Sequence, residues 1–298
     1  MGTRNFRELL EARWAADHFV CVGLDSDYPK IPGIVREQQD QVIGASILAF
    51  NRAIIDATHD LVGAYKPNIA FYAAYGRKGL AALRDIIGYI HFAAPETPVI
   101  LDAKRADIGN TNAGYVLEAF DYLDADAITV HPYLGAEALQ PFLDREDKGV
   151  FILCRTSNPG AGEFQNMQVP MPPGRYAGKY HHVGPHFPLY QPVAHRVATE
   201  WNKNSNCGLV VGATYPKELR EVRALAGDIP ILIPGIGAQG GDVEATIGAG
   251  MDSHGAGMII NSSRGIIFAS SGADFADAAR LATLELHTLI NQYRKVVI

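Results

Sequence analysis

Eight short apolar runs recur along this chain of 298 residues, and most of them are separated by stretches with the amphipathic pattern of helices. The runs are 19–24, 61–65, 98–101, 127–130, 150–154, 208–211, 229–233 and 255–260. Each run is almost continuously hydrophobic, which is typical of parallel strands that are buried on both faces. The helix-like stretches include 44–58, 79–94, 112–123, 192–202, 215–226 and 273–293. This alternation predicts an α/β fold, a (β/α)8 TIM barrel with residues 1–298 as one domain. A doubly wound sheet is the alternative, because a strand count alone does not force closure.

The composition is that of a globular protein, with 48% hydrophobic and 19% charged residues. The net charge of −6 gives no indication of a nucleic-acid surface. The three cysteines, Cys21, Cys154 and Cys207, each lie in or beside an apolar run, which favours buried, reduced thiols in a cytoplasmic protein. Residues 1–10 lack an apolar core, so we expect no signal peptide. No run reaches the roughly 18 apolar residues of a membrane span, and we expect no membrane association.

The barrel predicts where functional residues should lie, because active sites of this fold form at the C-terminal ends of the strands. Polar or glycine residues follow nearly every run. They are Asp25; Lys66 and Asn68; Asp102 and Lys104; His131; Thr156, Ser157 and Asn158; Gly212 and Thr214; Pro234, Gly235 and Gly237; and Asn261, Ser263 and Arg264. Strand termination alone explains part of this pattern. Strand termination does not explain two lysines directly at strand ends, Lys66 and Lys104, which favour a catalytic role.

The segment 101–111 carries two carboxylates and two cations within six residues, directly after an apolar run. Side chains alternate along a strand, so we expect Asp102 and Lys104 to point to one face and Ala103 to the other. An acid and a lysine are costly to bury together at the end of a strand. This arrangement is therefore more typical of a reaction site than of packing.

The segment 235–240 matches the pattern G-x-G-x-x-G after a strand, yet it does not indicate a dinucleotide fold. It lies late in the chain, and the region about twenty residues on is apolar and lacks an acidic residue for a ribose. In a barrel, this loop follows the seventh strand, where phosphate is frequently bound. The eighth strand leads into Arg264, which can grip a phosphate with two donors, and Gln239 can add a neutral donor. Plain turns with a surface arginine are the alternative.

The stretch 159–191 is too long for an ordinary connection and is rich in Pro, Gly, His and Tyr. We interpret it as an inserted loop after the fifth strand that forms a lid over the site. A surface insertion that packs on the domain or on a neighbour is the alternative. The spacing of His181, His182 and His186 fits no standard metal site, so we predict no metal.

Asp102-x-Lys104-x-x-Asp107-Ile108 closely resembles the D-x-K-x-x-D-I signature of the orotidine 5′-monophosphate decarboxylases. Further segments resemble the longer-chain branch of that family: 22–25, 66–68, 156–159, 234–239 and 261–264. The resemblance extends from Phe19 to about Arg264, and the motifs together are highly specific. The long loop 159–191 has no pattern that can be carried over.

The resemblance implies a homodimeric TIM barrel that converts orotidine 5′-monophosphate to uridine 5′-monophosphate and CO2 in pyrimidine biosynthesis, without metal or organic cofactor. It implies a catalytic array of Lys66, Asp102, Lys104 and the partner's Asp107. Ile108 and Thr111 would also reach into the partner's site. Asp25 and Asn68 would hold the ribose, and Thr156 and Ser157 would meet the pyrimidine edge. The remaining residues, on the loops that would hold the phosphate, are Pro234, Gly235, Gly237, Gln239, Ser263 and Arg264.

The implied reaction explains these residue types. Loss of CO2 leaves a carbanion in the plane of the pyrimidine ring, with no π system to spread the charge, so the protein must stabilise that charge electrostatically. Lys104 as an ammonium would do so and then protonate C6. Asp102 would keep Lys104 charged and would repel the substrate carboxylate. Lys66 and Asp107 would hold the array together.

Three other functions stay open at this point. A Mg²⁺-dependent sugar-phosphate decarboxylase or synthase of the same superfamily shares the D-x-K-x-x-D pattern. An aldolase would form a Schiff base on Lys66 or Lys104. A non-catalytic phosphoribosyl-binding protein is the third, although a mere binder has no need of two buried lysines.

Overall fold

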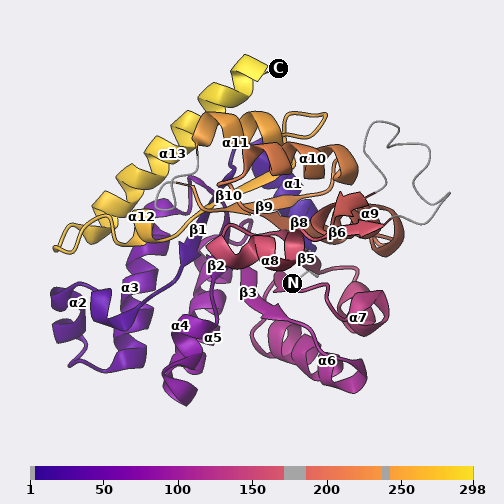
Figure 1. Ribbon diagram of the computed structural model, residues 1–298. Coiled ribbons are helices and arrows are strands. Elements are labelled where there is room, and N and C mark those ends of the chain that lie inside the picture. The colour runs from indigo at the N-terminus through magenta and orange to yellow at the C-terminus, as the bar shows by residue number, and fades with distance from the viewer. Residues whose placement is uncertain (1–3, 171–185, 237–241, 298) are drawn as a thin grey trace.

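Eight parallel strands close into a barrel in the computed structural model of the chain, which describes residues 4–170, 186–236 and 242–297. The strands are β1 Val20–Leu24, β2 Val62–Pro67, β3 Ile100–Arg105, β4 Ala127–Val130, β5 Gly149–Arg155, β8 Cys207–Val211, β9 Ile231–Pro234 and β10 Met258–Ser262. They are paired in the order β2-β1-β10-β9-β8-β5-β4-β3. The pairs Tyr65–Val99 and Asn68–Asp102 join β2 to β3. This closure confirms the predicted TIM barrel and excludes the doubly wound sheet (Figure 1).

All eight predicted runs lie at a strand, to within a few residues at each end. The physical reason is visible in β1, β8 and β10, in which every residue is buried. One face of each strand fills the barrel and the other packs beneath helices, so no polar alternation is needed.

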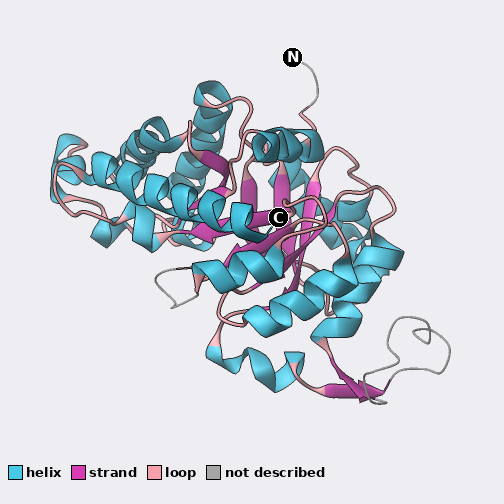
Figure 2. Cartoon of the chain, turned by 90° about the horizontal axis from the view of Figure 1, so that it is seen from above, coloured by secondary structure: helices cyan, strands magenta, loops and turns pink. Residues whose placement is uncertain are grey.

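Helices surround the barrel, as Figure 2 shows from above. They are α1 Phe6–Ala15, α2 Gly33–Gln38, α3 Ile43–Thr58, α4 Ala70–Ala73, α5 Gly76–Ala93, α6 Gly109–Val116, α7 Gly135–Leu143, α8 Gly162–Gln165, α9 Tyr190–Arg196, α10 Pro216–Ala226, α11 Val243–Gly250, α12 Arg264–Ile267 and α13 Phe275–Val297. Two π-helical segments, η2 Leu117–Tyr122 and η4 Val197–Trp201, extend α6 and α9. The short 3₁₀ helices are η1 Tyr28–Lys30 and η3 Pro159–Ala161. None of the described helices is long and apolar enough to cross a membrane.

Helix α1 packs against the N-terminal end of the barrel, opposite the end where the strands lead into their functional loops. The Trp14 indole donates to the Met258 carbonyl at 2.9 Å, and the Phe6 ring meets Phe151 edge-on at 5.6 Å. Gly149 is required beneath Phe6, because a Cβ there would lie 2.4 Å from the Phe6 ring. The helix thus seals one end of the barrel and leaves the other end for the site.

The stretch 159–191 is described only in part, because residues 171–185 lie outside the described ranges. Its described ends form η3, α8 and an antiparallel pair of short strands, β6 Gln168–Pro170 and β7 His186–Pro188. This pair projects from the body of the molecule in Figure 2. The stretch is an insertion after β5, and its use as a lid stays a prediction.

Candidate active site

Three of the predicted catalytic residues form one charged array at the C-terminal end of the barrel. The Lys66 ammonium, from β2, lies 3.0 Å from Oδ2 of Asp102 in β3. The Lys104 ammonium lies 2.6 Å from Oδ1 of the same carboxylate. Asp25, which follows β1, adds a second carboxylate whose Oδ1 lies 4.0 Å from Lys66 Nζ. Closure of the barrel between β2 and β3 is what brings Lys66 to Asp102.

Mutual attraction keeps this array ionised although much of it is buried. Burial raises the pKa of Asp102, but the ammonium groups of Lys66 and Lys104 outweigh burial and hold that pKa well below its ordinary value. Burial lowers the pKa of Lys66, but Asp102 and Asp25 reverse the effect and raise it above its ordinary value. Asp102 and Lys66 are therefore a stable ion pair, each holding the other in its charged form.

The backbone at Lys104 departs from the regular strand on which our sequence prediction rested. Lys104 adopts a φ of 47°, the left-handed region that non-glycine residues seldom enter. Asp102 and Lys104 do meet, as expected, but simple alternation is not the reason. The expectation of two buried lysines is also wrong for this single chain: the side chain of Lys66 is 5% exposed, whereas that of Lys104 is 50% exposed.

A cavity of about 140 Å³ adjoins the array and is lined by the loops after β9 and β10. Its lining residues are Asp25, Lys66, Asp102, Pro234, Gly235, Ile236, Asn261, Ser262, Ser263 and Arg264. Gly235 has a φ of 103°, a conformation that favours glycine. The structure thus places Asp25, Pro234, Gly235, Ser263 and Arg264 around one space beside the lysine–aspartate array. Gly237 and Gln239 lie outside the described residues.

Thr156 and Ser157 follow β5, and a residue of the insertion fixes the first of them. Gln165 of α8 accepts a hydrogen bond from the Thr156 amide at 2.9 Å and donates one to its hydroxyl at 2.9 Å. Ser157 lies so close to Gly212 that a Cβ at Gly212 would be 2.6 Å from the Ser157 Cβ. Sequence reasoning missed Gln165, because nothing in a single sequence connects it to Thr156.

Asp107, Ile108 and Thr111 are not brought to the array within one chain. The Asp107 carboxylate accepts from the Ile108 amide at 2.7 Å and forms no ion pair with either lysine of the array. Ile108 is 61% exposed, and Thr111 is exposed on α6. Asn68 is placed beside Asp102 in the sheet pairing, with its side-chain oxygen accepting from the Ala70 amide at 3.1 Å.

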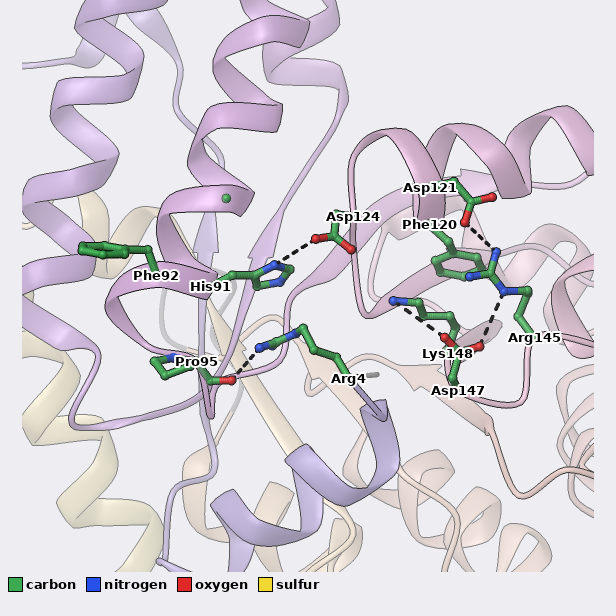
Figure 3. Close-up of a pocket in the computed structure, with 11 residues that line it drawn as sticks. Arg4, His91, Phe92, Pro95, Phe120, Asp121, Asp124, Arg145, Asp147 and Lys148 are labelled. Atoms are coloured by element: carbon green, nitrogen blue, oxygen red, sulfur yellow. Dashed lines mark hydrogen bonds and ion pairs between the residues drawn. The ribbon is translucent and has the colours of Figure 1, made fainter. Parts of the chain in front are cut away.

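A larger cavity, of about 830 Å³, lies near the opposite end of the barrel (Figure 3). Its cations are paired with acceptors rather than left for a ligand. Arg145 lies 3.0 Å from Asp121 and 3.5 Å from Asp147, and Lys148 lies 4.0 Å from Asp147. Size alone does not identify a reaction site. The convergent charges around the smaller cavity make that cavity the better candidate for the reaction site.

Asp126, beside this larger cavity, is fully buried and anchors the start of the chain. Its carboxylate accepts from Arg4 at 2.8 and 2.9 Å and from the Val99 amide at 2.9 Å. Burial raises the pKa of Asp126, but His91 and Arg4 outweigh burial and lower it to about 2. A carboxyl with a depressed pKa in the folded state stabilises the fold above its unfolded pKa, and that contribution is lost as the pH falls.

Asp126→Asn should lower the free energy of unfolding by about 2–3 kcal/mol at pH 7, because it breaks a buried, hydrogen-bonded ion pair. The difference from the wild type should shrink as the pH falls from 4 towards 2, where the wild-type carboxyl itself becomes protonated. Denaturant unfolding at pH 7, 4 and 3 measures both effects. The control is Asp60→Asn, which breaks an exposed pair with Arg280 of similar geometry, at 2.7 and 2.8 Å, and should cost less than about 1 kcal/mol. Equal losses in the two variants would contradict this assignment.

Known proteins resemble this chain over nearly its whole length. Residues 19–184 match the family described as Orotidine 5′-phosphate decarboxylase / HUMPS. The orotidine 5′-phosphate decarboxylase of Ralstonia nicotianae is 48% identical over 290 residues, which cover 97% of this chain and 99% of that protein. The one from an Azoarcus species is 48% identical over 291 residues, with 97% and 100% covered. The solved structure of Leishmania donovani OMP decarboxylase has a TM-score of 0.79 and 38% identity, and the match covers 98% of this chain and 99% of that one.

Proposed function

The chain belongs to the orotidine 5′-phosphate decarboxylase family and decarboxylates orotidine 5′-monophosphate to uridine 5′-monophosphate, and we propose that Lys66, Asp102 and Lys104 carry out this step. The observation that carries the assignment is the Asp102 carboxylate held between two ammonium groups, at 3.0 and 2.6 Å, beside the Arg264 cavity. The cavity would take the phosphate through Arg264 and the loop at Pro234 and Gly235. Asp25 Oδ1 accepts no hydrogen bond from the described residues, which leaves it available for a ribose hydroxyl.

The proposed mechanism breaks the bond between C6 and the carboxylate carbon of the substrate. CO2 leaves, and the electron pair stays on C6, where the Lys104 ammonium stabilises it. Lys104 then donates a proton to C6 and regains one from water. Asp102 fixes the position and charge of Lys104, and Lys66 keeps Asp102 ionised. Phosphate contacts remote from C6 contribute binding energy that orders the array and so lowers the barrier.

An aldolase reaction on Lys66 is disfavoured by the same electrostatics. A Schiff base forms from a neutral amine, and enzymes that use one lower the pKa of that lysine. Here Asp102 and Asp25 raise the pKa of Lys66 instead. The relatives offer no support for a magnesium-dependent sugar-phosphate reaction either, since the similar curated proteins carry the decarboxylase name.

We further propose a homodimer with shared active sites, in the cytoplasm. Apolar side chains are exposed around the predicted contact: Ile108 at 61%, Leu117 at 60%, Tyr133 at 84% and Leu134 at 44%. They lie on or next to α6, η2 and α7, and α6 and α7 are neighbours in Figure 1. Such a patch is typical of a protein interface. The three cysteines are free and buried, which favours a reducing compartment.

The decisive experiment follows the absorbance of the orotate ring after purified protein is mixed with orotidine 5′-monophosphate in the presence of a chelator. We expect rapid loss of the chromophore and the same rate with and without chelator, because in the proposed step the Lys104 ammonium, rather than a metal ion, stabilises the carbanion. No loss of absorbance would contradict the function. A rate that collapses with chelator and returns with Mg²⁺ would contradict the proposed metal-free mechanism.

A further inference from the structure

The pairing of β3 with β4 is interrupted at the charged array. Leu101 pairs with Ile128, and the next pair is Arg105 with Val130. Three residues of β3, 102–104, therefore face a single residue of β4, Thr129. Backbone groups in such a bulge lose their ladder partners and need others.

The Thr129 side chain supplies those partners. Its hydroxyl oxygen accepts from the Ala103 amide at 3.1 Å and from the Lys104 amide at 3.0 Å. The same hydroxyl donates to Asp102 Oδ1 at 2.9 Å. A hydroxyl has one proton and two acceptor lone pairs, so this group is fully used. Thr129 is 1% exposed, so this hydroxyl is shielded from bulk solvent.

We propose that Thr129 is a positioning residue for the decarboxylation, an inference that rests on the proposed function of the array. Its hydroxyl orients the Asp102 carboxylate and also holds the Lys104 backbone at its φ of 47°. A residue in that region persists only where its surroundings enforce it. Without the hydroxyl, the two amides have no acceptor, and the bulge should relax towards a regular strand. That change would move the Lys104 ammonium away from Asp102.

The test compares Thr129→Val, which keeps the shape but removes the hydroxyl, with Thr129→Ser, which keeps the hydroxyl. We expect kcat to fall about 10- to 100-fold in Thr129→Val and to stay within a few-fold of the wild type in Thr129→Ser. KM should change little in both variants, because the phosphate cavity does not include Thr129. Thr129→Ala, compared with Thr129→Ser, gives the same test if the valine variant does not fold.

The matched control is Thr283→Val, which removes a hydroxyl that is also buried but donates only to the Ala279 carbonyl within α13. It should leave kcat and KM unchanged, with thermal unfolding recorded for every variant. A folded Thr129→Val with wild-type kcat would overturn the inference, as would an equal loss in Thr129→Ser, which would assign the effect to packing volume. Failure of the wild type to consume orotidine 5′-monophosphate would instead contradict the proposed function itself.

Discussion

Lys104→Ala should lower kcat for decarboxylation by about 10⁴-fold or more, because in the proposed mechanism it removes both the charge that stabilises the carbanion and the proton donor for C6. The Lys104 ammonium lies 2.6 Å from Asp102, and no other lysine touches that oxygen among the described residues. Binding should be affected less than turnover, since the phosphate contacts lie on other loops. Steady-state and single-turnover loss of the orotate absorbance separate the two.

Two further variants sharpen this prediction. Lys104→Arg keeps a cation but not a usable acid, because a guanidinium does not release its proton in proteins, so this variant should also be inactive. Arg7→Ala removes a cation paired with Glu11 on α1, near the other end of the barrel, and should keep wild-type activity. Substantial turnover by Lys104→Ala would contradict the role of Lys104 while leaving the reaction itself intact.

The barrel was predictable from the sequence because its strands are defined by local chemistry. Runs such as 150–154 and 208–211 are apolar without interruption, and burial on both faces makes each one a strand wherever it lies in the sheet. Helix α1 was not predicted. Its buried Arg13 hides the pattern, because the partners of the guanidinium lie far along the chain: it donates to the carbonyls of Val62, at 2.8 Å, and His59, at 3.2 Å, and pairs with Glu96.

The candidate site was predictable as a set of residues but not as a geometry. Sequence placed Lys66, Asp102 and Lys104 at strand ends, and closure of the barrel brings them together. It did not predict the left-handed backbone of Lys104, because the cause is a hydroxyl on another strand. Thr129 stands in an apolar run, 25 positions beyond Lys104, and no pattern in one sequence connects the two.

The proposed mechanism places Asp107 at the catalytic array, but within a single chain Asp107 does not contact that array. Its carboxylate contacts the neighbouring Ile108 amide rather than the array, and Ile108 is 61% exposed. Two chains related by a twofold axis would each present the same patch to the other. If the proposed homodimer forms in this way, Asp107 completes the array of the other chain, and each chain alone is incomplete.

Mixing Lys104→Ala with Asp107→Ala should therefore restore activity that neither variant has alone. After random exchange of subunits, half of the dimers are mixed, and each mixed dimer has one site with both substitutions and one with neither. About one quarter of all sites should then be intact, and activity per chain should rise from near zero to about a quarter of the wild type. Co-expression with two affinity tags isolates the mixed dimer for the assay.

Mixing Lys104→Ala with Asp102→Asn is the control, because both residues belong to the same site and no intact site can form. An absence of recovery in the first mixture, or full activity of Asp107→Ala alone, would mean that the active site is not shared.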